Sequence, residues 1–460
     1  MNYNEFLKTK ELKIEPSGFS VSISDLNKNL FNWQKELVRW STRLGKSALF
    51  EGCGLGKTIQ QLEFARLVSE ETKHPVLILA PLAVSRQTKK EGEKFGIKVS
   101  ITEGKIYPGV NITNYEKLHK IDTSKFSGIV LDESSILKSY SGKIRNQIIN
   151  FFETTKYKLC CSATPAPNDY MELGNTCEFL NILSRLEMLS SFFIHDSGET
   201  SKWRLKGHTK KELFWKWLAS WSVMIQKPSD IGFDDNGFVL PKLNIYKYIL
   251  KTNKRKGKGF FLVGNDLGGI QERRKARWDS LSFRSDFIAD MINKSNDIWI
   301  VWCNLNEEGK ILNSLIKDSV EIAGHHSNEY KENNMLDFAD NKIKCLITKP
   351  SIAGFGMNWQ NCSNIAYMGL SDSWEQFYQS LRRSWRFGQK KEVNINVVIG
   401  DNEVSVLDNI MLKESKFTEM NNALSKYMGE FMKQNIFQSI NSKIEYDANM
   451  KMILPKFMEV

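Results

Sequence analysis

The sequence predicts an α/β protein with two lobes, each built on a parallel β-sheet, joined by a short helical insertion and followed by a helical tail. Two sets of short apolar runs, within residues 47–165 and 296–400, alternate with amphipathic stretches. Strands that alternate with helices form parallel sheets that are covered on both faces. The chain has 460 residues, and 41% of them are hydrophobic. That is enough material for two or three domains with cores of their own.

The first lobe is predicted to span residues 1–185 and to contain five buried strands. Each run is apolar and ends in small or polar residues, and the stretch between the first two has an amphipathic helical pattern. Ligands and catalytic groups gather at the carboxyl ends of parallel strands. The predicted strands are residues 47–52, 74–81, 109–115, 126–135 and 156–165.

Residues 186–245 differ from this pattern because they are rich in tryptophan and basic residues. We expect a helical insertion and linker there, with its tryptophans packed against the first lobe rather than stacked on bases. A second lobe is predicted over residues 246–400, and a Met-rich helical tail over residues 401–460. The tail is expected to cover the second lobe, or alternatively to bind a protein partner. The strands predicted in the second lobe are residues 296–304, 344–350, 364–370 and 393–400.

The charge and the cysteines narrow the class of protein. A net charge of +11 favours a polyanionic partner, and nucleic acid is the usual one. No apolar run is long enough to cross a bilayer, and the N-terminus lacks the apolar core of a secretory signal. The seven cysteines include no C-x-x-C pair. They predict reduced, buried thiols of a cytoplasmic protein rather than disulfides or a zinc site.

The segment EGCGLGKT, residues 51–58, lies between a predicted strand and a predicted helix. In a P-loop, glycines let backbone N–H groups surround phosphate oxygens, a lysine reaches the β- and γ-phosphates, and a hydroxyl binds Mg²⁺. Glu51 stands where the strict pattern has glycine. The segment predicts an ATP site that uses Mg²⁺, with these binding residues: Gly54, Leu55, Gly56, Lys57 and Thr58.

A pair of carboxylates supplies what a P-loop needs in addition. The apolar run at residues 129–131 ends in Asp132 and Glu133. Hydrolysis requires an acidic ligand for the metal and a group that orients the attacking water. We expect Asp132 to coordinate Mg²⁺ together with Thr58, and Glu133 to polarise the water. The simpler alternative is an ordinary acidic turn at the end of a strand.

The segments between about residue 31 and residue 398, and their order along the chain, resemble helicase superfamily 2, and within it the SWI/SNF-like branch. The resemblance implies two RecA-like lobes. The short insertion between the lobes indicates a compact bacterial, phage or mobile-element protein. The matching segments are residues 30–40 (adenine contact), 51–60 (motif I), 76–91 (motif Ia), 131–139 (acidic box), 162–180 (motif III), 297–312 (motif IV), 353–365 (motif V) and 375–393 (motif VI).

The resemblance implies roles for further residues of the first and second lobes. Gln34 would bond the adenine base, and Gly354 and Gln379 would contribute to ATP binding. Ser162 and Thr164, in the segment SATP, would couple hydrolysis to movement.

Motif VI would supply positive charge to the transferring phosphate from the second lobe. Arg383 and Arg386 fall at the family's spacing, and cations at the γ-phosphate stabilise the transition state. The alternative is a basic helix face that forms ion pairs with its neighbours. The sequence departs from the branch at three places: Ser134 and Ser135 replace the Ala-His of the acidic box, and Trp385 replaces a histidine. No residue of this sequence is therefore evident for the coupling role that the resemblance gives to the acidic-box histidine.

The nucleic-acid track is expected along the edges of both lobes, where hydroxyl, amide and cationic groups hold phosphates without identifying bases. Two basic clusters, residues 254–258 and 273–277, are further candidates or simply solvated surface. The residues assigned to DNA binding are Ser85, Arg86, Thr348, Lys349, Gly356 and Asn358.

The sequence therefore predicts an ATP-dependent DNA motor that translocates on DNA, double-stranded rather than single-stranded. A strand-separating helicase is the close alternative. An ATP-gated DNA clamp with slow hydrolysis is the non-enzymatic one. A packaging motor with a nuclease would need a carboxylate cluster in the C-terminal half, where the sequence has QSLRRSWRFGQ instead.

Overall fold

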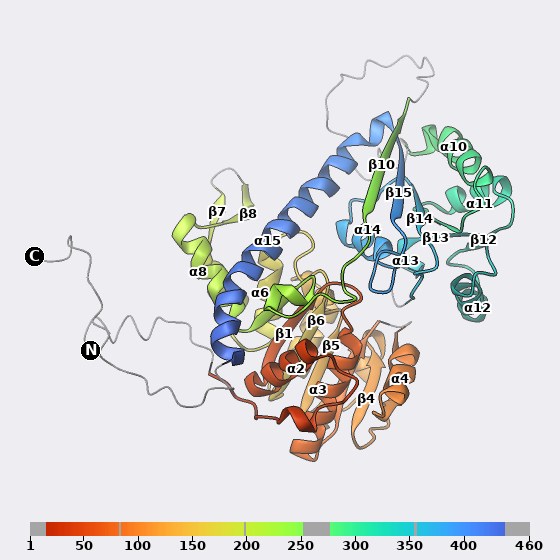
Figure 1. Ribbon diagram of the computed structural model, residues 1–460. Coiled ribbons are helices and arrows are strands. Elements are labelled where there is room, and N and C mark those ends of the chain that lie inside the picture. Colours follow the sequence, from red (N-terminus) through yellow and green to blue (C-terminus); the bar gives the residue numbers. More distant parts are fainter. Residues whose placement is uncertain (1–14, 82–83, 197–198, 252–276, 354–356, 438–460) are drawn as a thin grey trace, which may run out of the picture.

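The computed structural model describes residues 15–81, 84–196, 199–251, 277–353 and 357–437 (Figure 1). Two fully parallel sheets carry helices on their faces, and the sheet of the second lobe lies above that of the first in this view. A long C-terminal helix runs beside both. The predicted α/β fold class, with two RecA-like lobes and a helical tail, is confirmed.

The first lobe is built on a seven-stranded sheet with the order β3-β4-β2-β5-β6-β1-β9. Neighbouring strands are parallel throughout, and the central strands are buried on both faces. The strands are β1 (Lys46–Glu51), β2 (Val76–Ala80), β3 (Val99–Ile101), β4 (Val110–Asn114), β5 (Gly128–Asp132), β6 (Tyr157–Ser162) and β9 (Ser222–Ile225).

Helices follow the strands of this lobe at their carboxyl ends. The helix α2 ends at Gly45, whose left-handed φ of 76° closes the helix and turns the chain into β1. The helices are α2 (Asn32–Leu44), α3 (Lys57–Thr72), α4 (Ser85–Lys94), α5 (Lys143–Phe151) and α6 (Leu173–Phe179). Short 3-10 turns are η1 (Ile23–Asp25), η2 (Tyr115–Lys120), η3 (Thr123–Lys125), η4 (Ser134–Lys138) and η5 (Tyr170–Glu172).

The region between the lobes holds more than the expected helices. The helix α7 (Arg185–Phe192) leads into an antiparallel hairpin of β7 (Phe193–Asp196) and β8 (Glu199–Leu205), and then into α8 (His208–Ala219). The strand β9 pairs with β1, so the sheet of the first lobe takes its edge strand from beyond residue 185. Of the tryptophans in this region, Trp215, Trp217 and Trp221 are buried in the hydrophobic core, as expected, and Trp203 on β8 is partly buried against it.

The second lobe is built on a six-stranded parallel sheet with the order β10-β15-β14-β11-β13-β12. The sequence did not predict its two edge strands, because both are only partly buried and their residues lack an apolar run. The strands are β10 (Leu243–Leu250), β11 (Trp299–Trp302), β12 (Ser319–Ile322), β13 (Cys345–Thr348), β14 (Asn364–Met368) and β15 (Val393–Gly400). The helices are α10 (Leu281–Asn293), α11 (Asn306–Leu315), α12 (Asn328–Ala339), α13 (Pro350–Ala353) and α14 (Trp374–Leu381).

The tail helix α15 (Val404–Phe437) follows the turn η7 (Asp401–Glu403) and runs from the second lobe back to the first (Figure 1). Near the second lobe, the ring of Phe417 lies 4.7 Å from that of Trp374. Farther along, the helix packs against α8, β9 and the turn η6 (Pro228–Ile231). The expected contact with the second lobe is present, and α15 contacts the first lobe as well.

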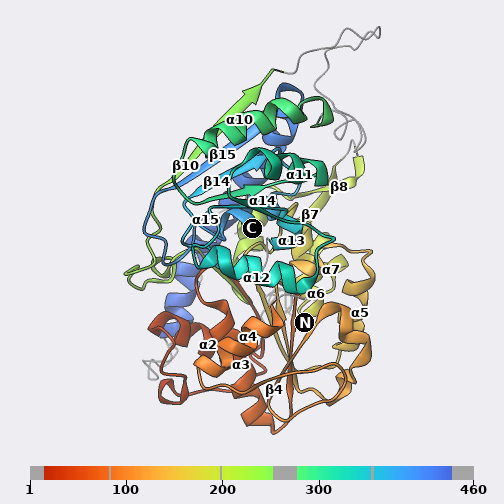
Figure 2. The same cartoon turned by 90° about the vertical axis from the view of Figure 1, so that its right-hand side faces the viewer.

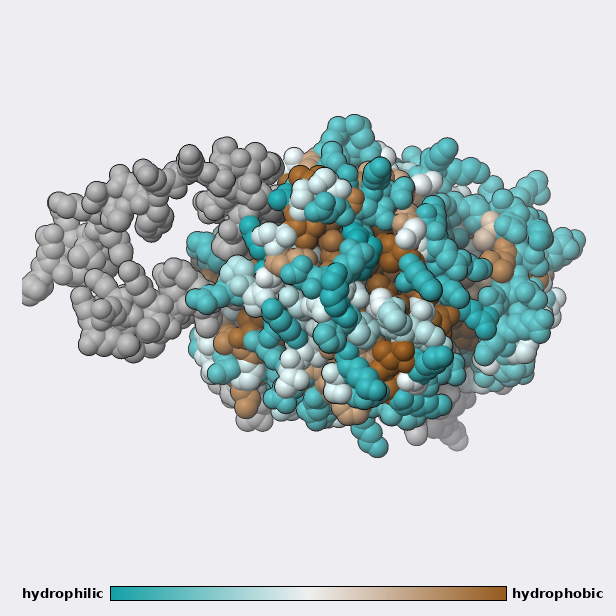
Figure 3. Space-filling view, turned by 90° about the horizontal axis from the view of Figure 1, so that it is seen from below, coloured by the Kyte–Doolittle hydropathy of each residue, from teal (hydrophilic) through white to brown (hydrophobic). Residues whose placement is uncertain are grey.

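The described residues include no helix long and apolar enough to span a membrane. The face of the molecule seen in Figure 3 is mostly hydrophilic, with apolar side chains in separate patches. All seven cysteines are free, and six of them are buried. The partly exposed one is Cys53, which lies in the loop after β1.

The burial of α15 generates a prediction about stability. Leu424 is fully buried on this helix, whereas the side chain of Leu412 is 59% exposed. Leu424→Ala should lower the free energy of unfolding by about 2–5 kcal/mol, because it removes buried methyl groups and leaves a cavity. Leu412→Ala is the matched control and should change it by less than about 0.5 kcal/mol. Urea unfolding followed by circular dichroism measures both, and equal losses would contradict the packing of α15.

Candidate nucleotide site between the two lobes

The loop between β1 and α3 has a backbone that only glycine can adopt at two positions. Gly54 and Gly56 have φ angles of 92° and 78°. A Cβ on Gly54 would lie 2.8 Å from the backbone nitrogen of Phe387, and a Cβ on Gly56 would lie 2.6 Å from Nε2 of Gln34. The loop ends at the first turn of α3, a helix of 16 residues. The N-terminus of such a helix favours anions.

The ammonium group of Lys57 already lies inside this loop. Its Nζ donates to the carbonyl oxygen of Glu51 at 2.8 Å and to that of Gly52 at 3.3 Å. Both acceptors are neutral, and a charge-assisted bond to a phosphate oxygen is the stronger interaction. The lysine is thus placed to exchange carbonyl acceptors for phosphate.

Gln34, on α2, forms a hydrogen bond with the backbone of this loop. Its Nε2 donates to the carbonyl oxygen of Leu55 at 2.8 Å, and its Oε1 accepts from the backbone N–H of Phe31 at 3.0 Å. Both ends of the buried amide are therefore engaged within the first lobe. The amide keeps one further N–H and one further lone pair, which are the groups that a contact with adenine would use.

Asp132 stands at the carboxyl end of β5 and is oriented by a residue that the sequence analysis did not identify. Gln61, on α3, donates from Nε2 to Oδ1 of Asp132 at 2.8 Å. Burial raises the pKa of Asp132, while Gln61 and Lys57 act in the opposite direction. A hydrogen bond of this kind fixes the orientation of a metal-binding carboxylate.

Glu91, on α4, is a second acidic group that the sequence analysis missed. Nε2 of Gln87 donates to it at 3.2 Å. Burial raises the pKa of Glu91, and Gln87, Arg386 and a hydrogen bond with Thr58 lower it. The predicted metal ligand Thr58 therefore lies next to a carboxylate from the neighbouring helix.

Glu133 has a backbone conformation that is uncommon for a residue with a side chain. Its φ is 64°, in the left-handed region. The hydroxyl of Ser162, at the end of β6, donates to its Oε1. Burial, followed by the charge of Glu375, raises the pKa of Glu133 to about 7. The carboxyl group predicted to polarise water is thus poised near neutral pH.

Glu51, which occupies the first position of the loop in place of glycine, is fully buried. Nε2 of Gln60 donates to its Oε2 at 2.8 Å. Burial raises the pKa of Glu51 to about 7, against a smaller lowering by Lys57. The carboxyl group of Glu51 thus bonds within the first lobe, to α3.

The second lobe presents three arginines of motif VI to this loop. Nη2 of Arg382 donates to the carbonyl oxygen of Cys53 at 2.8 Å, so the residue that touches the loop is one that the sequence analysis did not assign. Nη1 of Arg383 donates to the carbonyl oxygen of Met357 at 3.1 Å. Burial lowers the pKa of Arg383 to about 10 and also lowers that of Arg386.

Several polar atoms at this junction are buried without a partner among the described residues. They are Nε of Arg383, Nε of Arg386 and both amide atoms of Gln379. Buried donors and acceptors are nearly always bonded, and each exception requires an explanation. Guanidinium groups bind phosphate oxygens strongly, so these groups fit a nucleotide held between the lobes.

The predicted DNA-binding residues differ in their placement. Ser85 is buried at the start of α4. Arg86 is exposed and pairs with Glu332 of α12 in the second lobe at 3.3 Å. The helices α4 and α12 both lie on the side of the molecule that faces the viewer in Figure 2. Lys349 donates to Asn306 at 2.6 Å, and Asn358 is exposed.

Thr348 is not placed for a side-chain contact with DNA. It is buried, and its hydroxyl donates to the carbonyl oxygen of Ile322 at 3.0 Å. Gly354 and Gly356 lie outside the described residues, as do residues 254–258 and 273–276 of the basic clusters. Arg277 is described, and it pairs with Glu403 at 3.0 Å.

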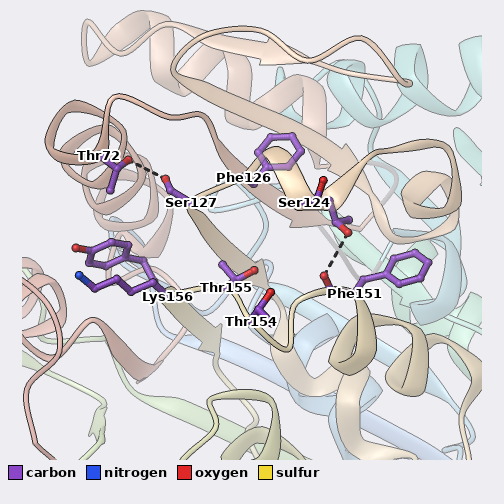
Figure 4. A pocket seen from close by; sticks show the side chains of 10 residues that line it. Thr72, Ser124, Phe126, Ser127, Phe151, Thr154, Thr155 and Lys156 are labelled. Carbon is purple, nitrogen blue, oxygen red and sulfur yellow. Dashed lines mark hydrogen bonds between the residues drawn. The ribbon is translucent and has the colours of Figure 1, made fainter.

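The pocket drawn in Figure 4 lies at the amino-terminal ends of the strands of the first sheet, opposite the loop at residues 51–58. It has a volume of about 260 Å³ and lies where β5 and β6 begin. The hydroxyls of Thr72 and Ser127 face each other across its wall at 2.8 Å. None of the predicted site residues lines it. In parallel sheets the amino-terminal edge is not where ligands bind.

Two family models match the chain. Residues 33–195 match the SNF2-related domain, and residues 284–388 match the helicase conserved C-terminal domain. The chain therefore contains an SNF2-related domain followed by a helicase conserved C-terminal domain. Its SNF2-related domain contains the phosphate-binding loop and the two carboxylates of the acidic box. Its helicase C-terminal domain contains the three arginines of motif VI.

Curated relatives match these domains at low identity. A CHD3-type chromatin-remodeling factor, CHR7, from Arabidopsis thaliana is 24% identical over 39% of this chain and 17% of its own length. The SWI/SNF-related matrix-associated actin-dependent regulator of chromatin subfamily A-like protein 1 from Bos taurus is 21% identical over 93% of this chain and 49% of its own. Helicase SWR1 from Candida albicans is 28% identical over 38% of this chain and 12% of its own length. The chain thus spans about half or less of each relative.

A solved structure, the Sulfolobus solfataricus SWI2/SNF2 ATPase core in complex with double-stranded DNA, is also similar. The match covers 93% of this chain and 100% of that one, with 18% identity and a TM-score of 0.43.

The support of Asp132 by Gln61 generates a prediction about the metal. Gln61→Leu should raise the Mg²⁺ concentration needed for half-maximal ATP turnover by about 10- to 100-fold, because the carboxylate loses the bond that orients it. A Mg²⁺ titration of the turnover rate measures this. Gln60→Leu is the matched control, since Gln60 is equally buried but bonds Glu51 instead. An unchanged requirement in Gln61→Leu would contradict the role.

The buried Glu51 generates a prediction about pH. Its pKa rises from 4.5 to about 7 on folding, so the folded state holds the proton more tightly than the unfolded chain. The stabilisation from that proton is present below about pH 4.5 and is lost as the pH rises through about 7. Glu51→Gln keeps an acceptor for Gln60 and cannot lose a proton. Its melting temperature relative to the wild type should therefore rise between about pH 5 and pH 8, and a constant difference would contradict the prediction.

Proposed function

We propose that the chain is an ATP-dependent motor that couples ATP hydrolysis to translocation on double-stranded DNA. One observation carries this proposal. The loop at residues 51–58 and the acidic pair Asp132 and Glu133 come from the first lobe, and Arg382 reaches from the second lobe to the same loop. A nucleotide in that position would contact both lobes. Its hydrolysis would then change the affinity between them.

The residues divide the chemistry among them. Lys57 and the N–H groups of the loop bind the phosphates, and Glu133 orients the attacking water. Arg383 and Arg386 stabilise the charge that develops on the transferring phosphoryl group. Their buried Nε atoms without partners support this role.

Mg²⁺ fits the first lobe through Asp132 and the hydroxyl of Thr58. Asp132 and Thr58 would hold the ion, which would supply positive charge to the phosphate oxygens. The described residues contain no group of three acidic, histidine or cysteine side chains able to hold a metal alone. This agrees with a metal that takes most of its ligands from nucleotide and water.

DNA is the proposed track, held through its phosphates. The net charge of +11 supports a polyanionic partner. Arg86 on the first lobe, and Lys349 and Asn358 on the second, have solvent-accessible polar side chains of the kind that hold phosphates. Such binding is largely independent of sequence and weakens steeply with salt.

The type of organism and the cellular location are also part of the proposal. The short insertion at residues 186–245 supports a compact protein of bacterial, phage or mobile-element type. Free thiols at all seven cysteines support a cytoplasmic location. A protein partner for the tail stays a prediction.

The rate of ATP hydrolysis without nucleic acid and with double-stranded DNA, single-stranded DNA or RNA tests the proposal. We expect duplex DNA to stimulate hydrolysis most. Lys57→Ala should abolish the stimulated rate, because the phosphates lose their main cation. Glu133→Gln should bind ATP but turn it over about 100-fold or more slowly, since the water loses its orienting group.

Other outcomes point to the alternatives. Stimulation mainly by single strands would favour a strand-separating helicase. DNA binding that depends on ATP but not on hydrolysis would favour a clamp. Stimulation by RNA alone would contradict the proposal, and so would an unchanged rate in Lys57→Ala.

A further inference from the structure

Glu375, at the start of α14 in the second lobe, reaches into the first lobe. Its side chain is only 7% exposed. It forms an ion pair with Lys138 of η4, in the segment that follows the acidic box. The hydroxyl of Thr164 donates to its Oε1 at 3.4 Å. One carboxylate of the second lobe thus contacts two separate segments of the first.

Thr164 connects this carboxylate to the acidic box. The backbone N–H of Thr164 donates to Oγ of Ser162 at 3.0 Å. The hydroxyl of Ser162 donates in turn to Oε1 of Glu133. A path of hydrogen bonds, linked through the covalent atoms of Thr164, therefore runs from Glu375 of the second lobe to the carboxyl group that is proposed to orient water.

We propose that Glu375 is a positioning residue that couples closure of the two lobes to the placement of Glu133. The proposal rests on the proposed ATPase function. It gives a role to Glu375, for which the resemblance to motif VI implies none. Closure brings Glu375 against Lys138 and Thr164. Opening withdraws it and leaves the Thr164 hydroxyl without this acceptor.

Two features of the first lobe make such a contact effective. The left-handed backbone of Glu133 is strained and needs outside contacts to hold it. The position of its carboxyl group therefore depends on Ser162. The acidic box also has Ser134 and Ser135 in place of Ala-His, so the coupling role has no histidine to carry it. Glu375 and Lys138 connect the same segment to the second lobe instead.

The first test separates turnover from substrate binding. Glu375→Ala should lower the kcat of DNA-stimulated ATP hydrolysis about tenfold and change the KM for ATP by less than about threefold, because it misplaces a catalytic group without touching the nucleotide. Glu375→Gln keeps an acceptor for Thr164 but loses the ion pair, so its loss should be smaller. Gln376→Ala, on the next residue of α14, is the matched control and should retain the wild-type kcat. A kcat in Glu375→Ala within about twofold of the wild type would overturn the proposal.

The second test asks whether Glu375 acts through Ser162. In a Ser162→Ala background, Glu375→Ala should cause a further loss of less than about twofold, because the chain to Glu133 is already broken. Losses that multiply would overturn the relay. The charge-reversed pair Glu375→Lys with Lys138→Glu should recover part of the loss seen in Glu375→Lys alone, and no recovery would overturn the role of the ion pair.

The controls separate this inference from the proposed function. A wild-type protein without ATP turnover, or with turnover that survives in Lys57→Ala, contradicts the ATPase itself. Turnover that requires Lys57 but is indifferent to Glu375 contradicts only the coupling role. Melting temperatures equal to that of the wild type establish that the variants fold.

Discussion

Burial of charge where the two parallel sheets meet is the constraint on which the rest of the structure depends. Asp132 and Glu133 come from one lobe, and Arg383 and Arg386 from the other. Burial raises the pKa of the carboxyls and lowers that of the guanidinium groups. A buried charge is costly unless it faces an opposite charge or a polar ligand. The junction therefore favours closure, and it favours a ligand that brings both a metal cation and phosphate anions.

The contacts between the lobes are of two kinds. Those at the junction are polar, such as the bonds of Arg382 and Glu375, and water can replace them when the lobes separate. Those of α15 combine apolar packing, as at Phe417 on the second lobe and at the buried Met420 and Leu424, with polar bonds such as that from Lys413 to the carbonyl oxygen of Asp372. Apolar contacts lose stabilisation when water enters.

The residues that complete the site come from positions without a distinctive pattern. Gln61 and Asp132 are 71 residues apart in the chain, Thr164 and Glu375 are 211 apart, and Cys53 and Arg382 are 329 apart. A glutamine in an amphipathic helix, or an extra arginine beside two expected ones, has no local signature. Only the arrangement of the strands brings these side chains together.

The sequence by itself determined the two parallel sheets, the glycine-dependent loop at residues 51–58 and the acidic pair at the end of β5. Buried strands and glycine-dependent turns leave local patterns, because each residue must suit its own backbone and environment. The tertiary structure alone decided that β9 completes the first sheet, that α15 returns to the first lobe, and that Glu375 meets Thr164. These outcomes depend on how elements far apart in the chain share one core, and no local pattern records that.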